Sequence, residues 1–147
     1  METIDLSMHF RVPIEKVWKL IADYEGYTFL EEISSSKLLQ EGRDEKNGVG
    51  AVRELHFQVQ GQGITFVEKI ITFDPPNCLE YLIEECTIPV KHEIGRMDFT
   101  SNGDGTDIHW ISRFEYPPDR SQEPAMCQAM SETFMSFLEQ IKARLEA

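Results

Sequence analysis

The residues best suited to chemistry in this sequence are two glutamates, Glu68 and Glu93. Two carboxylates that share an apolar interior have their pKa values pushed apart, so one can donate a proton while the other accepts one. Aldol-type cyclisation and dehydration need such proton transfer. The alternative is that one or both acids form ion pairs with Arg53, Arg96 or Lys69, or face solvent, and have no catalytic role.

Other residues that could act in chemistry lack the partners that their motifs need. His92 and Glu93 open a His-Glu-x-x pattern, but the second histidine of a zinc site is missing and the segment is predicted as a strand. The four histidines lie on four predicted strands without the spacing of metal ligands. Gly48-Val49-Gly50 precedes a strand rather than a helix, so it is not a phosphate-binding loop. We therefore expect no metal and no other cofactor.

Length and charge limit the classes of protein to consider. The 147 residues predict one domain that covers positions 1–147. The net charge of −12 repels phosphate backbones, so we expect no nucleic-acid partner. No apolar run reaches the ~18 residues of a membrane span, and the first residues lack the features of a signal peptide. Three irregularly spaced cysteines indicate reduced thiols and a cytoplasmic location.

The sequence before Ile33 predicts a strand followed by one or two short helices. Ile4–Phe10 alternates between apolar and polar residues, as a half-buried strand does. Pro13 suits the first turn of a helix, and apolar residues follow it at helical spacing from Ile14 to Ile21. The aromatic residues around Tyr27 then predict either a second short helix or an aromatic-rich loop.

The rest of the chain predicts an antiparallel meander closed by a long helix. Six further segments have period two and are separated by turn signals: Ile33–Gln40, Val49–Val59, Gly63–Phe73, Cys78–Glu84, Val90–Thr100 and Asp107–Tyr116. Apolar residues then recur at helical spacing from about Ser121 to Glu146. The buried stripe of this helix must lie on the sheet, because nothing else in the chain is large enough to cover it.

This arrangement predicts an internal cavity. One helix cannot fill the interior of a curved seven-stranded sheet at normal packing density, so large side chains or a ligand must occupy the remaining space. The alternative is that the aromatic and methionine side chains make a solid core. We expect the following residues to line the cavity: Phe66, Glu68, Tyr81, Ile83, Trp110, Ser112, Phe114, Met126, Met130 and Phe134.

Several segments together resemble a known superfamily. They are Pro13–Asp23, Gly48–Arg53, Val67–Ile70, Asp74-Pro75-Pro76, Leu79-Glu80-Tyr81 and Asp104–Trp110. In this order and spacing, from Leu6 to Leu145, the chain resembles the SRPBCC superfamily, which includes START and Bet v 1-like proteins, and within it the bacterial polyketide cyclase/dehydrase branch. The resemblance implies an α+β helix-grip fold. In this fold a seven-stranded curved antiparallel sheet wraps around a long C-terminal helix, with one or two short helices after the first strand.

The resemblance also implies roles for individual residues. Glu68 matches a glutamate that, in the receptors of this superfamily, points into the cavity and holds water or ligand. Glu93 stands where a tyrosine is expected and would be a second acid on the inner face. Arg53 matches the arginine of a Gly-x-Gly-x-x-Arg pattern and could pair with either acid. Trp110 replaces a residue that is often acidic, which makes this pocket more apolar.

Three functions are compatible with these observations. The first is a cytoplasmic carrier or sensor that binds a small hydrophobic molecule such as a lipid, an aromatic compound or a polyketide-like compound. The second is a metal-free cyclase, aromatase or dehydratase in which Glu68 and Glu93 move protons and Arg53 stabilises an enolate. The third, which rests on analogy alone, is an interaction protein that assists another complex. We expect a monomer or a homodimer.

Overall fold

The computed structural model describes residues 2–88, 90–115 and 123–147, which form one sheet, two α-helices and a short 3-10 helix. The predicted helix start at Ser121, the predicted strand end at Tyr116 and the turn residue Pro89 lie outside the described residues. In chain order the elements are β1 (Glu2–Phe10), α1 (Ile14–Ile21), η1 (Tyr27–Phe29), β2 (Ile33–Gln40), β3 (Val52–Val59), β4 (Gln62–Asp74), β5 (Cys78–Cys86), β6 (Lys91–Asn102), β7 (Gly105–Glu115) and α2 (Glu123–Leu145).

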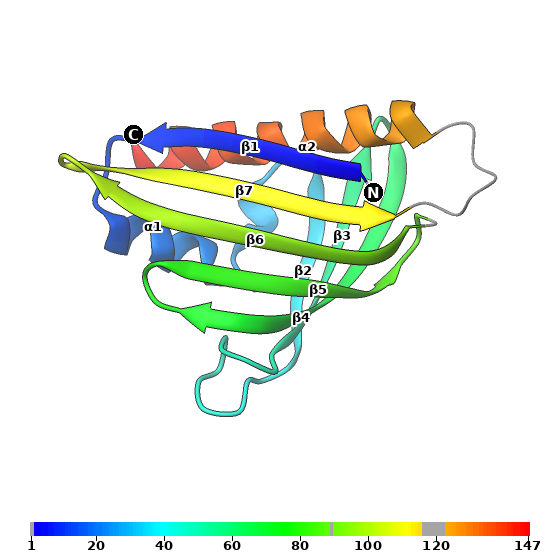
Figure 1. Cartoon of the computed structure of the whole chain (residues 1–147), viewed down its shortest axis with the longest axis horizontal. Helices are drawn as coiled ribbons and strands as arrows, with labels where there is room; N and C mark the ends of the chain where they lie inside the picture. The colour runs from blue at the N-terminus through cyan, green and yellow to red at the C-terminus, as the bar shows by residue number, and fades with distance from the viewer. Residues whose placement is uncertain (1, 89, 116–122) are drawn as a thin grey trace.

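The sheet is antiparallel throughout and follows the chain as a meander from β2 to β7. Its strand order is β1-β7-β6-β5-β4-β3-β2, so β1 is added beside the last strand. Figure 1 shows that the sheet curves and that α2 runs along it behind β1 and β7. Because α2 contacts both β1 and β3, it lies across the concave side of the sheet. The helix-grip fold that the resemblance implies is confirmed.

Burial shows which face of each strand points toward α2. In β4 the buried side chains are Ile64, Phe66, Glu68 and Ile70, a register that the alternation of apolar residues left open. In β7 Ile108 is buried together with Trp110, Ser112 and Phe114, the three residues of this strand that were expected to face the interior. The facing stripe of α2 consists of Met130, Phe134, Phe137, Leu138 and Ile141. These three stripes enclose the interior in which the candidate site lies.

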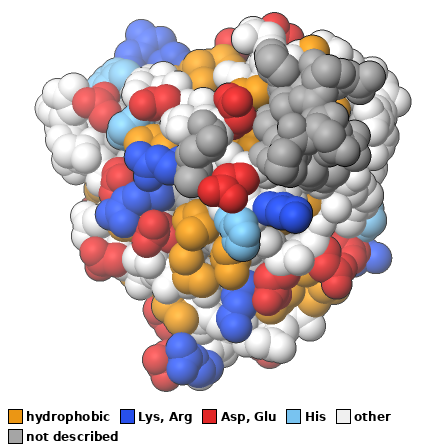
Figure 2. All heavy atoms as spheres, turned by 45° about the vertical axis from the view of Figure 1, so that its right-hand side comes forward, with side chains coloured by type: hydrophobic (Ala, Val, Ile, Leu, Met, Phe, Trp, Pro, Cys, Tyr) orange, Lys and Arg blue, Asp and Glu red, His pale blue; other side chains and the backbone are white. Residues whose placement is uncertain are grey.

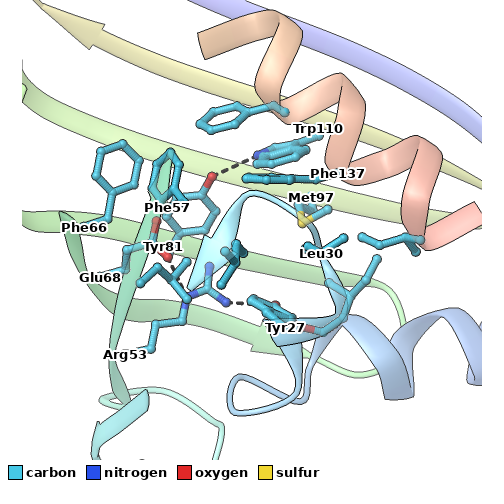
Figure 3. A pocket seen from close by; sticks show the side chains of 15 residues that line it. Tyr27, Leu30, Arg53, Phe57, Phe66, Glu68, Tyr81, Met97, Trp110 and Phe137 are labelled. Atoms are coloured by element: carbon cyan, nitrogen blue, oxygen red, sulfur yellow. Dashed lines mark hydrogen bonds and ion pairs between the residues drawn. The ribbon is translucent and has the colours of Figure 1, made fainter. Parts of the chain in front are cut away.

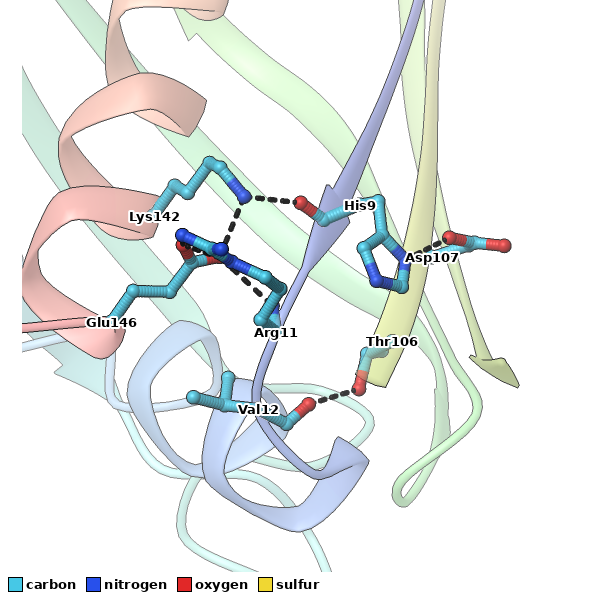
Figure 4. Close-up of polar contacts among 7 residues, drawn as sticks. All are labelled: His9, Arg11, Val12, Thr106, Asp107, Lys142 and Glu146. Carbon is cyan, nitrogen blue, oxygen red and sulfur yellow. Dashed lines mark hydrogen bonds and ion pairs between the residues drawn. The ribbon is translucent and has the colours of Figure 1, made fainter. Parts of the chain in front are cut away.

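A polar clamp joins the end of α2 to the end of β1 (Figure 4). The Lys142 ammonium donates a hydrogen bond to the carbonyl oxygen of His9 at 2.8 Å and contacts a Glu146 carboxylate oxygen at 2.5 Å. The backbone N–H of Arg11 donates to the same carboxylate at 2.8 Å. These contacts connect the C-terminal end of α2 to the end of β1.

The surface carries charges of both signs. On the face turned forward in Figure 2, acidic and basic side chains are interspersed, and hydrophobic atoms are exposed in small groups between them. The large apolar side chains that are exposed among the described residues are Leu39, Ile71 and Ile94. None of the described helices is both long enough and apolar enough to cross a membrane.

Candidate functional site

A largely apolar cavity lies between the sheet and α2 (Figure 3). Its volume is about 60 Å³. Every described strand except β1 and all three helices contribute to its lining. The lining residues are Ile21, Tyr27, Leu30, Ile33, Arg53, Leu55, Phe57, Phe66, Glu68, Tyr81, Met97, Trp110, Phe134, Phe137 and Ile141.

Aromatic rings make one wall of the cavity and narrow it. The Trp110 ring of β7 is stacked on Phe134 of α2, with ring centroids 4.6 Å apart and planes inclined by 13°. Phe57 lies edge-on to Phe66 at 5.0 Å and to Phe137 at 5.9 Å. Offset and edge-to-face contacts of this kind hold rings in fixed orientations. The remaining space is smaller than the ~150 Å³ cavity that holds a benzene molecule, so a ring-sized ligand must move some of these side chains apart as it binds.

A buried ion pair forms the polar part of the cavity. Arg53 of β3 and Glu68 of β4 lie directly opposite each other in the strand register. The Arg53 Nε donates to a Glu68 carboxylate oxygen at 2.6 Å, and the two residues are only 4% and 2% exposed. Two buried charges need each other because either one alone would lose hydration without compensation. The alternative of an ion pair, which the sequence left open for Glu68, is therefore the one that the structure adopts.

Three tyrosine rings surround the guanidinium group of Arg53. Its central carbon lies 4.7 Å from the Tyr24 ring centroid, 5.0 Å from that of Tyr81 and 5.7 Å from that of Tyr27. Its Nη1 also donates to the Tyr27 hydroxyl at 3.2 Å, and that hydroxyl donates to the carbonyl of Ile21. A cation over aromatic faces is stabilised by the ring quadrupole. Arg53 is therefore held on several sides at once.

Burial determines the protonation states around this pair. Burial lowers the pKa of Arg53. The interactions with Glu68 and the surrounding tyrosines raise it by more, so the pKa of Arg53 is raised overall. The pKa of the Glu68 carboxyl is raised overall, because burial raises it by more than Arg53 lowers it. The pKa of the Tyr81 hydroxyl is raised well above its ordinary value by burial and by the negative charges of Glu68 and Glu93. Tyr81 therefore remains protonated at neutral pH.

A glycine on the neighbouring strand makes room for Tyr81. Gly95 of β6 lies opposite Tyr81 of β5, and a β-carbon on Gly95 would lie 2.0 Å from the Tyr81 ring carbon Cζ. The Tyr81 ring therefore lies over bare backbone, and its hydroxyl accepts a hydrogen bond from the Trp110 indole N–H at 2.9 Å. The absence of a side chain at Gly95 thus positions both Tyr81 and Trp110.

Glu93 lies on the inner face but does not line this cavity. It is 2% exposed, and its carboxylate accepts a hydrogen bond from the Ser112 hydroxyl at 2.9 Å. Burial raises the pKa of Glu93 to about 7, the Ser112 hydrogen bond lowers it, and the charge of Glu68 raises it further. The strand register shifts between Lys91 and Ile94, and His92 has φ 54°, so a β-bulge precedes the inward side chains of β6.

The structure separates the predicted site residues into two groups. Six of them line the cavity: Arg53, Phe66, Glu68, Tyr81, Trp110 and Phe134. The other six do not line it: Ile83, Glu93, Ser112, Phe114, Met126 and Met130. Ser112, Phe114 and Met130 are buried toward the end of the sheet where β7 ends and α2 begins, beyond the Trp110–Phe134 stack. The two glutamates are thus both buried, but they do not line the same space.

Several lining residues were not among those predicted. Phe137 and Ile141 lie three and seven positions after Phe134 in α2, so the helical stripe itself was a signal for them. Tyr27 and Leu30 lie in or beside η1, where no periodicity marks the inward side. Met97 lies in β6 two residues after Gly95, on the same face. The one signal for Met97 was the alternation of side chains along the strand, which places it on the same face as Glu93.

The histidines lie away from this cavity. His9 and His109 are exposed on the outer side of β1 and β7, where they contact Asp107 and Asp5, each at 2.7 Å. His56 contacts Glu54 at 2.9 Å, and His92 is exposed in the bulge. Among the described residues no group of three or more potential ligands is arranged to hold a metal ion.

Comparison with known families and structures gives similar proteins over the whole chain. A family model described as polyketide cyclase/dehydrase and lipid transport matches residues 1–146. No curated protein matches the sequence.

Three solved structures show how widely this fold is shared. A START superfamily protein from Mycobacterium smegmatis is 16% identical, with a TM-score of 0.82 over 98% of this chain and 97% of that chain. The ginseng major latex-like protein 151 from Panax ginseng is 13% identical, with a TM-score of 0.82 over 97% and 96%. The ZhuI aromatase/cyclase from Streptomyces sp. R1128 is 19% identical, with a TM-score of 0.81 over 99% and 93%. At these identities the likeness concerns the fold alone.

Proposed function

The chain belongs to the polyketide cyclase/dehydrase and lipid transport family, within the SRPBCC superfamily, and we propose that it binds a small hydrophobic molecule in the cavity beneath α2, as a carrier or sensor. The observation that carries this proposal is the lining. Apart from Arg53 and Glu68, it consists of aliphatic, aromatic and methionine side chains. Ligand pockets commonly combine such a lining with a few convergent polar groups.

The state of the polar groups favours binding over catalysis in this cavity. Glu68 is held in an ion pair by Arg53 at 2.6 Å, so accepting a proton would leave the buried Arg53 charge without its partner. Glu93, the other candidate acid, does not line the space that Glu68 lines. The aromatic wall around Trp110 and Phe134 further favours a flat aromatic or polyketide-like molecule.

A pair of matched substitutions tests this proposal. Ile141→Phe adds volume inside the cavity, whereas Ile71→Phe makes the same change at an exposed position of β4. With a panel of apolar probes and native mass spectrometry, we expect Ile141→Phe to weaken binding by about tenfold or more, because a filled cavity leaves the ligand no room. Ile71→Phe should bind as the parent protein does. Equal binding by both variants, or no binding by the parent, would contradict the proposal.

A second candidate function is acid–base catalysis by Glu93. Its support is a carboxyl that is buried, hydrogen-bonded by Ser112 and has a pKa of about 7, which suits proton transfer at neutral pH. Incubation with a poly-β-ketone substrate should then yield a cyclised product that has lost water, detected by mass spectrometry. Glu93→Gln should abolish this product while Glu84→Gln, at an exposed position of β5, leaves it unchanged. Full conversion by Glu93→Gln would exclude this candidate.

A further inference from the structure

We propose that the cavity selects an uncharged ligand that carries a carbonyl or hydroxyl oxygen, and that Tyr81 donates a hydrogen bond to this oxygen. The inference rests on the proposed binding function and adds the chemical class of the ligand. Its grounds are the charge balance of the lining and the hydrogen bonding of Tyr81.

The charges in the lining already cancel. Arg53 is the one cation among the lining residues, and its Nε donates to Glu68 at 2.6 Å. A ligand carboxylate would bring a second anion to one guanidinium, and the buried Glu93 would add further repulsion when it is ionised. A ligand cation would likewise meet Arg53. A buried charge without a partner costs several kcal/mol, so charged ligands are disfavoured in both cases.

The guanidinium of Arg53 is also occupied by other groups. Tyrosine rings lie 4.7 and 5.0 Å from its central carbon, and the Tyr27 hydroxyl accepts a hydrogen bond from Nη1. A ligand carboxylate that sought a bidentate contact would have to displace Glu68 or one of these rings. Figure 3 shows Arg53 and Glu68 meeting at the base of the group, with Tyr81 between them and Trp110.

The Tyr81 hydroxyl supplies the donor for an uncharged ligand. Its oxygen accepts from Trp110 at 2.9 Å, while its own hydrogen has no acceptor among the described residues. Because burial and the nearby carboxylates keep this hydroxyl protonated, it can donate to a ligand oxygen. Both Tyr81 and Trp110 line the cavity, so a ligand that lies against the Trp110 ring has its oxygen within reach of this donor.

Four naphthalene probes of nearly equal shape test the inference: 2-acetylnaphthalene, 2-ethylnaphthalene, 2-naphthoate and protonated 2-naphthylmethylamine. Binding is followed by NMR at about pH 7.5, where these acid and amine groups are charged. The indole N–H of Trp110 reports from the cavity, and that of Trp18, which packs between Phe73 and Phe99 outside the lining, is the internal reference.

We expect the ketone to bind tightest, with the carboxylate and the ammonium compound weaker by about tenfold or more. The ethyl compound should bind about three- to tenfold more weakly than the ketone, because it cannot accept the Tyr81 hydrogen bond. Tyr81→Phe should remove that difference but keep the rejection of the carboxylate. Glu68→Gln should shift the preference toward the carboxylate; the comparison on the parent protein does not depend on how well this variant folds.

The outcomes separate the inference from the function on which it rests. If 2-naphthoate or the ammonium compound binds the parent protein as tightly as the ketone, the inference is overturned while the binding function stands. If the ketone and ethyl compounds bind equally, the role of Tyr81 is overturned. If none of the four probes moves the Trp110 signal, both the inference and the proposed function are overturned.

Discussion

The buried pair of Arg53 and Glu68 can be broken from either side. Glu68→Gln leaves the Arg53 charge without its partner, and we expect this to lower the free energy of unfolding by about 3–5 kcal/mol. Chemical denaturation measures the loss.

The double variant Arg53→Met/Glu68→Met is the control for this prediction. It removes both charges and leaves apolar groups of similar length, so it should lose less stability than Glu68→Gln alone. If the double variant is the less stable of the two, the pair is not held together by mutual charge compensation.

Glu93 should make stability depend on pH. Its folded pKa of about 7 lies above the ordinary value of 4.5, so the folded state binds the proton more tightly than the unfolded state. The stabilisation by this group is therefore full below about pH 4.5 and is lost as the pH rises to about 7, a change of about 3 kcal/mol. Glu93→Gln removes this titration. The free energy of unfolding of the variant should therefore increase relative to that of the parent as the pH rises from about 5 to about 8.

The exposed Glu84→Gln variant provides the reference for that pH series, because this glutamate lies outside the interior. Its difference from the parent should stay constant over the same range. A constant difference for Glu93→Gln as well would contradict the assigned pKa.

Gly95 should be intolerant of even one methyl group. The β-carbon of Gly95→Ala would lie 2.0 Å from Tyr81 Cζ and 2.3 Å from the Tyr81 hydroxyl oxygen, so the ring must move. We expect a loss of about 1–3 kcal/mol and a shift of the Trp110 indole N–H signal, since its hydrogen bond to Tyr81 is disturbed. Gly63→Ala in β4, where the nearest atom would be 3.7 Å away, is the matched control and should cost less.

Residue types and alternation were enough to predict part of the cavity. Trp110 and Phe134 follow regular patterns in β7 and α2, and both line the cavity. Phe66 and Glu68 line it too, but both faces of β4 are largely apolar, so alternation did not identify its inner face, and Glu68 was expected inside from the resemblance. Tyr27 could not be predicted in this way, because it lies in a single turn of 3-10 helix without a repeating pattern. The role of Gly95 depends on a ring from the neighbouring strand, and a contact between strands cannot be read from one segment.

At the scale of elements, the clamp between α2 and β1 depends on Glu146. Hydrogen bonds from Lys142 and from the Arg11 backbone lower the pKa of this carboxyl to about 2. Because this pKa is lowered, the ionised Glu146 carboxylate stabilises the folded state above about pH 4.5, and this stabilisation is lost as the pH falls toward 2. Glu146→Gln should therefore lower the Tm at about pH 7, and the gap to the parent should narrow at about pH 3.

Glu139→Gln is the control for the clamp, since Glu139 is an exposed residue of the same helix. Hydrogen exchange should speed up in the last turn of α2 for Glu146→Gln and stay unchanged for Glu139→Gln. Equal exchange in both variants would show that apolar packing alone holds this end of α2.

The order and type of the elements could be predicted, but some of their ends could not. β2 has the predicted bounds, and a segment of turn signals begins at Glu41, directly after its last residue Gln40. β3 begins at Val52 rather than Val49, since Gly50 has φ 92° and cannot continue a strand. The turn between β6 and β7 is shorter than predicted. β6 continues to Asn102 and β7 begins at Gly105, because Gly103, with φ 63°, allows a tight turn between them.

At the scale of the whole molecule, the single helix does close the sheet, but aromatic side chains fill much of the space that remains. Normal packing density requires large side chains or a ligand in the interior, but it does not determine the proportion of the two. The proportion depends on side-chain orientations such as the Trp110–Phe134 stack, which are set by contacts between α2 and the sheet and between neighbouring strands. The result is a narrow cavity whose polar part is the Arg53–Glu68 ion pair, in which the two charges cancel.

The pairing of β1 with β7 has a consequence for how the protein is made. A ribosome releases β1 first, yet its partner is the last strand to emerge: Leu6 pairs with Trp110. The hairpins from β2 to β7 can form one after another as the nascent chain lengthens, because each strand meets the one before it. Throughout that time Ile4, Leu6 and Phe10 have no neighbouring strand to cover them, so the nascent chain exposes these apolar side chains until β7 has emerged.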